Sequence, residues 1–306
     1  MNILLLGGSG LVGSSIKENI KRKKLRYSAP SRKELNLFSY NKIKNYLNEN
    51  KITHVINCAA KVGGILDNQN NQIKYYEENN ELNYNIIKAC KNYKIQNFIN
   101  LGSSCMYPKT YLGKMNENHL MSGPLEETNL TYALSKISAA YYLNSIRKEM
   151  NLNYTTLIPC NLFGINDKFD LQRAHLIPAI IAKIYKAKIN NEKKIMIWGS
   201  GRPKREFLFV DNVAEYIVSS IIHGVKFPPF LNIGANKDYS VKQYYEIVMK
   251  LMKIKLKIEY DSNKPDGMKR KLIDSSLAIN KYNWKVKYSL EDGIKKTISF
   301  FLKNNV

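Results

Sequence analysis

Long apolar runs are missing from this chain of 306 residues. Uninterrupted apolar stretches such as Ile3 to Leu6 are far shorter than the roughly 18 residues that a membrane-spanning helix needs. The first residues also lack the basic region, apolar stretch and cleavage site of a secretory signal. We therefore expect no membrane segment and a protein that stays in the cytoplasm.

Cysteine is scarce, and its spacing is uninformative for metal binding. The four cysteines form no CxxC pair; they are Cys58, Cys90, Cys105 and Cys160. Closely spaced cysteine pairs are typical of structural zinc sites, and a disulfide framework belongs to small secreted chains. The sequence thus predicts reduced thiols, no disulfide and no metal site.

Acidic residues are few relative to basic ones. The chain has 48 Lys and Arg against 25 Asp and Glu, a formal net charge of +23. Only eight of the basic residues are arginine, and the 40 lysines are spread along the chain. A nucleic-acid-binding protein would more typically cluster Lys and Arg on one face. We expect no nucleic-acid partner, although a positive field attracts polyanionic small molecules such as dinucleotides.

Short apolar runs alternate with amphipathic stretches in the first half of the chain. They are 3–6 then 11–24, 54–58 then 72–93, 98–101 then 132–150, and 154–159. This alternation predicts an α/β fold with a parallel sheet and helices on both faces. After Asn161 prolines punctuate shorter elements, which predicts a smaller α/β lobe. We expect a dinucleotide-binding domain over 1–165, a substrate lobe over 166–206 and 236–306, and a return of 207–235 to the first domain.

A glycine-rich turn follows the first apolar run directly. Its sequence is Gly7-Gly8-Ser9-Gly10-Leu11-Val12-Gly13. A strand, a GxxGxxG turn and a helix start together predict a Rossmann-type doubly wound sheet, in which glycines allow the backbone to approach a pyrophosphate. The amides of the helix N-terminus bind the phosphates. We expect Gly7, Gly10, Leu11, Val12 and Gly13 to contact a dinucleotide.

The segment after the second expected strand, Leu25 to Ser28, distinguishes between two dinucleotides. An NAD site would place Asp or Glu there to bind the ribose hydroxyls. The chain instead reads Ala29-Pro30-Ser31-Arg32-Lys33. Arg32 favours the 2′-phosphate of NADP(H), with a solvated surface charge as the alternative.

A Tyr-xxx-Lys spacing places both side chains on one helix face. Among the pairs in the chain are Tyr40/Lys44, Tyr84/Lys88 and Tyr132/Lys136. Only the third follows a buried strand that ends in Gly102-Ser103-Ser104-Cys105, at the sheet edge where ligands bind. Ser103, Tyr132 and Lys136 therefore match the catalytic triad of short-chain dehydrogenases. We interpret the other two pairs as helix surface.

From Gly7 to Trp284 the sequence resembles the GDP-L-fucose synthase family, which belongs to the extended short-chain dehydrogenases. The motifs that carry the resemblance are Ala59-Ala60-Lys61-Val62-Gly63-Gly64-Ile65, Gly102-Ser103-Ser104-Cys105-Met106-Tyr107-Pro108-Lys109, Leu125-Glu126-Glu127-Thr128-Asn129, Asn161-Leu162-Phe163-Gly164, His175-Leu176-Ile177-Pro178-Ala179, Trp198-Gly199-Ser200-Gly201-Arg202-Pro203-Lys204-Arg205-Glu206-Phe207-Leu208 and Lys264-Pro265-Asp266-Gly267. The resemblance implies an NADPH-dependent epimerase-reductase of a GDP-linked 4-keto-6-deoxy sugar.

By this resemblance, Cys105 and His175 invert carbons 3 and 5 of the sugar, next to the ketone, and Ser103, Tyr132 and Lys136 serve the reduction at carbon 4. From the residues alone, Cys105 could instead be a small buried filler and His175 a helix-start histidine bonded to backbone. Cofactor contacts implied by the resemblance are Ala59, Ala60, Lys61, Lys136, Pro159, Asn161, Leu162 and His175. Implied contacts to the nucleotide sugar, in the second lobe and beside the catalytic serine, are Ser104, Asn161, Lys183, Trp198, Arg205, Asp266 and Lys271.

Some positions depart from the family pattern. Ser9 stands where some members have an arginine near the 2′-phosphate, so the preference for NADP depends more heavily on Arg32. Phe38-Ser39 stands where an acidic residue often helps to seat the adenine side, and Lys183 replaces an arginine expected at the diphosphate. None of these changes removes a catalytic group.

Other functions remain open. One is a reductase without epimerisation that acts on a GDP-4-keto-6-deoxy-heptose for capsule or lipopolysaccharide synthesis, because a pocket distinguishes one extra carbon only weakly. Another is a non-catalytic NADP-sensing protein. A dehydratase is disfavoured because Ser104-Cys105 supplies no carboxylate. The resemblance also implies a homodimer that pairs through helices near 72–93 and 132–150. The tyrosines of these segments fit an interface but equally fit a core; they are Tyr75, Tyr76, Tyr141 and Tyr142.

Overall fold

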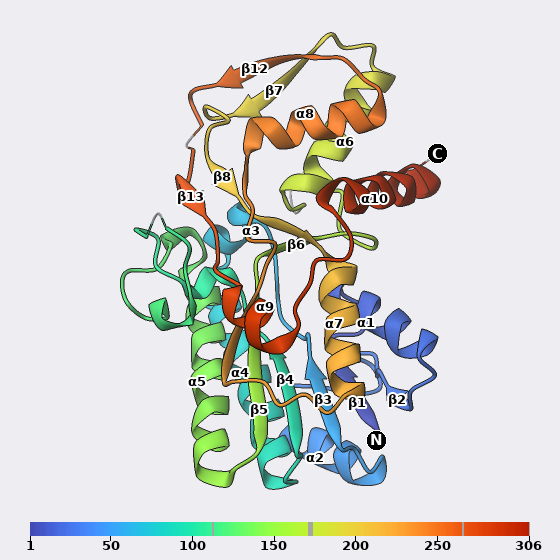
Figure 1. Ribbon diagram of the computed structural model, residues 1–306, viewed down its shortest axis with the longest axis vertical. Coiled ribbons are helices and arrows are strands. Elements are labelled where there is room, and N and C mark those ends of the chain that lie inside the picture. The colour runs from blue at the N-terminus through green and yellow to red at the C-terminus, as the bar shows by residue number, and fades with distance from the viewer. Residues whose placement is uncertain (112, 171–173, 265, 306) are drawn as a thin grey trace.

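The computed structural model describes residues 1–111, 113–170, 174–264 and 266–305. Its largest element is a six-stranded sheet with the order β10-β5-β4-β3-β1-β2, and every neighbouring pair is parallel (Figure 1). The strands are β1 (Ile3–Leu6), β2 (Tyr27–Ser28), β3 (His54–Asn57), β4 (Asn97–Leu101), β5 (Asn153–Pro159) and β10 (Phe230–Ile233). The expected doubly wound parallel α/β fold is confirmed.

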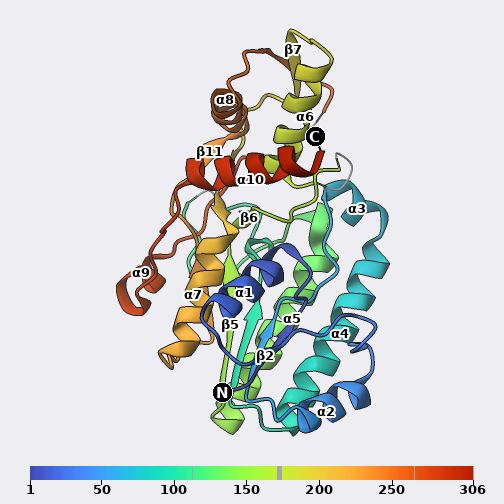
Figure 2. The ribbon, with the colours of Figure 1, turned by 90° about the vertical axis from the view of Figure 1, so that its right-hand side faces the viewer.

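Both faces of the sheet are covered by helices, so apolar residues of one strand are buried on both faces. Along β1, Ile3 and Leu5 pack into one core with α1 (Leu11–Arg22) and α7 (Val210–Ile222). Leu4 and Leu6 point to the opposite face and pack with α2 (Tyr40–Glu49), α4 (Gln72–Asn92) and α5 (Leu130–Met150). Figure 2 shows α1 and α7 on one side of the sheet and α4 and α5 on the other.

The order of the strands places a crevice at the end of β1. The strand that follows β1 in sequence, β2, lies on one side of it, and the next strand, β3, lies on the other side. Ligands of doubly wound sheets bind at such a reversal, outside the carboxyl ends of the strands. The glycine turn follows β1 at this edge.

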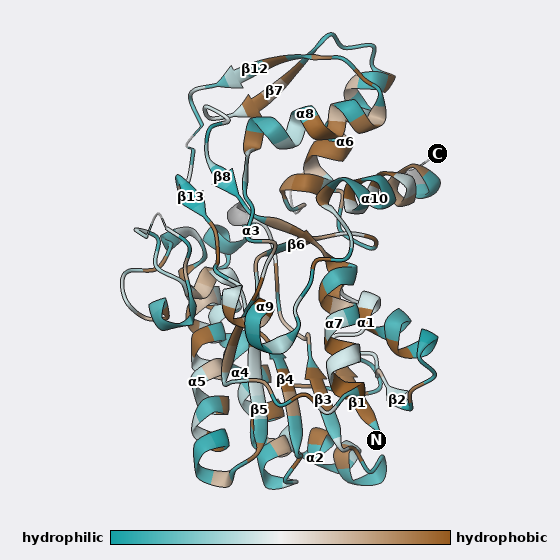
Figure 3. Cartoon of the chain, in the orientation of Figure 1, coloured by the Kyte–Doolittle hydropathy of each residue, from teal (hydrophilic) through white to brown (hydrophobic). Residues whose placement is uncertain are grey.

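The second lobe lies above that edge in Figure 1 and contains short strands and three helices. A two-stranded parallel sheet pairs β7 (Lys194–Trp198) with β12 (Lys257–Asp261), and β8 (Lys204–Arg205) lies between β11 (Tyr239–Ser240) and β13 (Arg270–Lys271). The helices are α6 (Leu176–Ile189), α8 (Val241–Met252) and α10 (Leu290–Asn305). Isoleucines of α6, with Phe207 and Tyr244, form a separate core. Figure 3 shows that α6 is largely hydrophobic, whereas β8 and β13 are hydrophilic.

Two connections join the lobes. β6 (Asn161–Phe163) pairs with β9 (Phe207–Phe209), and β9 leads into α7, which packs on α1. β10 then joins the six-stranded sheet beside β5. The remaining helices are α3 (Ile65–Asn70), α9 (Ser276–Tyr282) and the 3-10 turns η1 (Ser104–Met106), η2 (Glu117–His119) and η3 (Glu127–Asn129).

Two local predictions differ from the structure. The second strand is shorter than the expected Leu25–Ser28, because only Tyr27 and Ser28 pair with β1. The helix expected to begin at Tyr132 begins at Leu130, directly after η3. Within the described residues, no helix has the length and apolar character needed to cross a membrane.

Candidate active site

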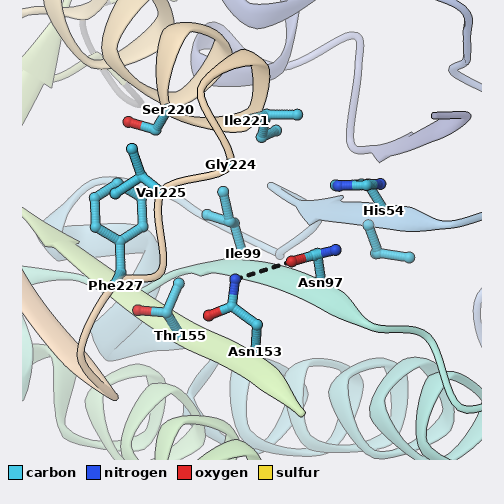
Figure 4. A pocket seen from close by; sticks show the side chains of 11 residues that line it. His54, Asn97, Ile99, Asn153, Thr155, Ser220, Ile221, Gly224, Val225 and Phe227 are labelled. Carbon is cyan, nitrogen blue, oxygen red and sulfur yellow. Dashed lines mark hydrogen bonds between the residues drawn. The ribbon is translucent and has the colours of Figure 1, made fainter.

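A small cavity lies at the amino end of the sheet, whereas ligands of doubly wound sheets bind at the carboxyl end. It measures about 30 Å³ and is lined at the amino ends of β3, β4 and β5 by His54, Asn97 and Asn153, with Phe227 opposite (Figure 4). Asn153 closes it by donating a hydrogen bond of 2.9 Å to Asn97. This volume is about that of one water molecule, and the cavity lies at the edge opposite the glycine turn.

The glycine turn has the geometry of a phosphate cradle. Gly7 has a φ of +76°, and an added Cβ would lie 2.7 Å from the amide nitrogen of Ala59. At Gly13 a Cβ would overlap the carbonyl oxygen of Gly7. Gly10 differs, because its nearest neighbour would be at an ordinary 3.5 Å, so the protein itself leaves room for a side chain there.

Gly10 is also the N-cap of α1 and makes no side-chain capping bond. Within the described residues, no side-chain acceptor bonds the amides of the first turn, which include those of Leu11 and Val12. A glycine with space above it, at an uncapped helix start, fits the close approach of a pyrophosphate. Arg32 lies at the same edge of the sheet, exposed on the loop after β2.

The residues after β3 complete the floor of this crevice. The amide of Ala59 donates to Asn57 Oδ1 at 3.1 Å, and Ala60 follows it in the same partly exposed segment. The Lys61 backbone amide bonds Asn79, while its ammonium pairs with Glu78 on α4 at 3.1 Å. The side chain of Lys61 is thus directed to α4 in this structure.

Ser103, Tyr132 and Lys136 come together at the carboxyl end of β4. Lys136 is 3% exposed, donates to the Leu101 carbonyl oxygen at 2.7 Å, and has its Nζ 5.8 Å from the centre of the Tyr132 ring. Burial lowers the pKa of Lys136 to about 8. Burial also raises the pKa of the Tyr132 phenol, and the adjoining Ser103 hydroxyl acts in the opposite direction.

The other two tyrosine–lysine pairs lie on helix surfaces away from that edge. Tyr84 is 52% exposed on α4, and Lys88 Nζ lies between its ring and that of Tyr40, 5.3 and 5.2 Å from their centres. Lys44 is exposed on α2. Neither pair adjoins a serine at the end of a strand.

Cys105 follows Ser103 in η1, and its sulfur faces two donors. Asn129 Nδ2 and Lys271 Nζ each lie 3.3 Å from Cys105 Sγ. The Cys105 amide donates to Ser103 Oγ at 3.2 Å, while Ser104 between them is only 3% exposed. The thiol therefore lies next to the triad, with a lysine from the other lobe against it.

His175 lies on the second lobe, at the N-cap of α6, and no side-chain cap hydrogen bond is present there in the described part of the chain. The residue is exposed at the surface, and desolvation by the neighbouring protein, together with the charge of Lys168, lowers the pKa of the imidazole. Pro159 ends β5, and Asn161 and Leu162 begin β6. Asn161 donates to the backbone of Glu206 at 2.9 Å.

The second lobe presents an exposed aromatic ring between lysines. Trp198 is 55% exposed, and the ammonium groups of Lys183 and Lys264 lie 5.1 and 5.7 Å from its ring. Arg205 is partly buried and donates to the Met268 carbonyl oxygen at 2.6 Å. Asp266 accepts bonds from the Ser200 hydroxyl and amide, which lower its pKa. Pro265 of the same motif lies outside the described residues.

Three features of the site were not predicted from sequence. They are the Asn129 bond to Cys105, the place of Lys264 beside Trp198, and a basic depression of about 870 Å³ lined by Arg202, Lys204, Lys242 and Lys264. Asn129 and Lys264 belong to the family motifs named above, but no local sequence pattern indicates which side chains they contact. Lys242 belongs to α8 and reaches the depression only through the fold.

Comparison with known proteins agrees with this arrangement. A model of the NAD dependent epimerase/dehydratase family matches residues 3–234. GDP-L-colitose synthase of Yersinia pseudotuberculosis is 41% identical over 100% of both chains, and GDP-L-fucose synthase of Azorhizobium caulinodans is 35% identical over 99% of this chain and 97% of its own.

Among solved structures, a GDP-6-OMe-4-keto-L-xylo-heptose reductase from Campylobacter jejuni superposes with a TM-score of 0.90. The match covers 99% of this chain and 98% of that chain, at 24% identity, which supports the fold alone. The chain belongs to the NAD dependent epimerase/dehydratase family and, within it, to the GDP-L-fucose synthase family of oxidoreductases.

Proposed function

We propose that the protein reduces the 4-keto group of a GDP-linked 4-keto-6-deoxy sugar with NADPH and also inverts carbons 3 and 5 of the ring. The observation that carries this proposal is the grouping of Ser103, Tyr132, Lys136 and Cys105 at one sheet edge. Relatives named GDP-L-fucose and GDP-L-colitose synthases, aligned over the whole chain, support it.

Bound NADPH supplies the hydride that reduces carbon 4. Tyr132 donates its phenolic proton to the ketone oxygen, and the Ser103 hydroxyl donates a hydrogen bond to the same oxygen. The positive charge of Lys136, held at 2.7 Å from the Leu101 carbonyl, stabilises the negative charge left on Tyr132. The Lys136 ammonium also bonds the cofactor ribose.

The inversions use the same ketone before it is reduced. The carbonyl makes the protons on carbons 3 and 5 acidic, so a base on one face and an acid on the other can exchange each of them. Cys105, on the side of the triad, and His175, on the second lobe, are the two groups that exchange these protons. Cys105 removes a proton and His175 returns one from the opposite face.

The two ligands occupy different lobes in this proposal. NADP(H) binds residues 1–165 with 207–235, with its pyrophosphate on Gly7 to Gly13 and its 2′-phosphate on Arg32. The GDP moiety binds 166–206 and 236–306. There Trp198 offers an exposed flat face, and Lys183 and Arg205 supply positive charge for the diphosphate. Lys271, which contacts Cys105, lies on the side of the sugar. Asn161, Ser104 and Asp266 bind polar groups of the nucleotide sugar.

Turnover of a defined ketone tests this function. Incubation with GDP-4-keto-6-deoxy-D-mannose and NADPH should consume NADPH and yield GDP-L-fucose, with NADH a poorer donor. Absence of NADPH oxidation with this ketone, in protein that binds NADPH, would refute the proposal. A parallel reaction with the GDP-keto-heptose tests the reductase-only alternative, which requires faster turnover of the heptose.

A second substrate is favoured by one observation, the 41% identity to a protein named GDP-L-colitose synthase. Colitose is fucose without the oxygen at carbon 3, so its 4-keto precursor needs inversion only at carbon 5. Competition between the two keto sugars for limiting enzyme separates these candidates. Preference for the 3-deoxy ketone would assign the protein a colitose-type product.

A further inference from the structure

We propose that Lys271 is a positioning residue for Cys105, whose sulfur its ammonium holds in place for the removal of ring protons. This inference rests on the proposed function, because it concerns the sulfur that takes up those protons. It does not depend on which GDP-linked sugar is turned over.

The first support is the set of groups around the sulfur. Cys105 Sγ lies 3.3 Å from Lys271 Nζ and 3.3 Å from Asn129 Nδ2. Both nitrogens are donors only, since an ammonium has no acceptor and an amide nitrogen has none either. A neutral thiol is a weak acceptor, whereas a thiolate accepts charge-assisted bonds. Two donors from different elements therefore hold the sulfur in place.

The second support is the balance of charge at this position. Besides Lys271, Lys136 and Tyr132 of α5 are coupled electrostatically to Cys105. Both lysines are cations when protonated, and the phenol is neutral. Within the described residues, no salt bridge or hydrogen bond joins the Lys271 ammonium to a carboxylate. The Lys271 charge also acts on the buried thiol of Cys160, but its ammonium lies at hydrogen-bond distance from the Cys105 sulfur.

The third support is the contrast with the other thiols. Burial raises the pKa of Cys58 to about 12 and raises the pKa values of Cys90 and Cys160 well above their ordinary range. Buried thiols without a cation at hydrogen-bond distance are inert. Cys105 is half-buried and has a lysine at its sulfur, so we expect it to react with electrophiles before the others.

The two partners come from different lobes. Cys105 follows β4, whereas Lys271 lies on β13, where it pairs with Arg205 of β8. The contact spans 166 residues in sequence. The lobe that carries the proposed GDP site therefore also supplies the cation for the proposed base, so the base is complete only when the lobes are docked.

The step that Lys271 assists balances without a further reagent. The Cys105 thiolate removes the proton next to the ketone, so the C–H bond breaks, an S–H bond forms, and the electron pair moves to the enolate oxygen. Protonated His175 then donates its proton to the carbon from the other face. The S–H proton afterwards passes to solvent and His175 takes up a proton from solvent, which resets both groups, and Lys271 undergoes no covalent change.

Alkylation of Cys105 by iodoacetamide, measured by peptide mass against pH in the full chain without substrate, tests the pairing. Lys271→Met keeps the length of the side chain and removes the charge, so the alkylation rate at neutral pH should fall about tenfold. Lys271→Arg should restore most of the rate. Lys269→Met, which removes an exposed charge two residues away, is the control and should react like the unmodified protein.

An unchanged rate and profile in Lys271→Met, or a Lys271→Arg variant as slow as Lys271→Met, would overturn the inference. Binding of NADPH by each variant checks that the fold is retained. Ring-proton exchange in deuterated water with the keto sugar is measured separately. If Lys271→Met slows alkylation but the unmodified protein exchanges no ring protons, the epimerisation is refuted and the pairing stands. If the unmodified protein exchanges ring protons but Lys271→Met is alkylated at the normal rate, the pairing alone is refuted.

Discussion

Burial distinguishes three tyrosine–lysine pairs that share one spacing. Lys136 is 3% exposed and bonded to a main-chain carbonyl, whereas Tyr84 is 52% exposed and Lys44 lies on a helix surface. A lysine buried beside a phenol can stabilise the tyrosinate in low dielectric, and an exposed lysine is screened by water. The environment at the end of β4 therefore gives the pair Tyr132/Lys136 its chemistry.

Replacing Tyr132 by phenylalanine removes the proton donor and keeps the ring. We expect NADPH oxidation with the keto sugar to fall by about 100-fold or more, while NADPH binding measured by fluorescence stays close to normal. Tyr84→Phe makes the same change in a surface pair and should retain full activity. Comparable activity in Tyr132→Phe would contradict the assignment of Tyr132 as the donor.

Replacement by alanine should have different effects at two glycines of the phosphate turn. In Gly10→Ala the new Cβ has room, so the free energy of unfolding should change by less than about 1 kcal/mol. The methyl group would occupy the approach of the pyrophosphate, so NADPH affinity should fall more than about tenfold.

Gly13→Ala is the matched comparison. Its Cβ would overlap the Gly7 carbonyl oxygen, and we expect destabilisation of about 1–3 kcal/mol or more, measured by denaturant unfolding. A Gly10→Ala protein that binds NADPH normally would mean that the cofactor does not lie over this helix start.

At the scale of elements, a buried carboxylate joins three segments of the second lobe. Glu206 is 1% exposed and lies between β8 and β9. Its oxygens accept bonds from the amides of Asn236, after β10, and Ile273, after β13. Burial raises the pKa of Glu206 to about 7.

This raised pKa predicts a pH dependence of stability with a defined sign. Between about pH 4.5 and 7 the folded state binds more protons at Glu206 than the unfolded state, so the free energy of unfolding should fall as pH rises through that range. The fall amounts to about 3 kcal/mol for this group. Glu206→Gln should remove that part of the pH dependence in urea unfolding at pH 5 and pH 8, whereas the exposed Glu49→Gln should not. An identical slope in Glu206→Gln would contradict the prediction.

Elements that depend on a local pattern can be predicted from the sequence. Contacts between residues that lie far apart in the sequence cannot. The strand before Gly7, the glycine turn and the position of Tyr132 on a helix follow from short-range periodicity and glycine placement. β8, β11 and β13 are two residues each, too short for a local sequence pattern to indicate them. The contact of Lys271 with Cys105 depends on the pairing of β13 with β8 and has no local signal.

At the scale of the molecule, α4 and α5 expose apolar side chains on the outside of the sheet. On α4 they are Ile73 (74% exposed), Tyr76 (48%) and Tyr84 (52%), and on α5 they are Leu134 (41%) and Tyr141 (37%). A contiguous exposed apolar patch is typical of an interaction surface. We propose that these helices pair with those of a second copy of the chain.

The mass in sedimentation tests this pairing. The unmodified protein should sediment at about twice 35.3 kDa, and Ile73→Glu combined with Tyr141→Glu should sediment as one chain. Ile189→Glu, a change at a 60% exposed isoleucine on the second lobe, is the control and should leave the dimer intact. A single-chain mass for the unmodified protein would reject the dimer.

The central claim is that one site at the carboxyl edge of the sheet both exchanges ring protons and reduces the ketone. The most direct test is the mass of the nucleotide-sugar product formed from GDP-4-keto-6-deoxymannose and NADPH in deuterated water. The account predicts a reduced sugar that carries deuterium at carbons 3 and 5. A reduced sugar without deuterium on these carbons would contradict it and leave a 4-keto reductase in which Cys105 and His175 do not act as acid and base.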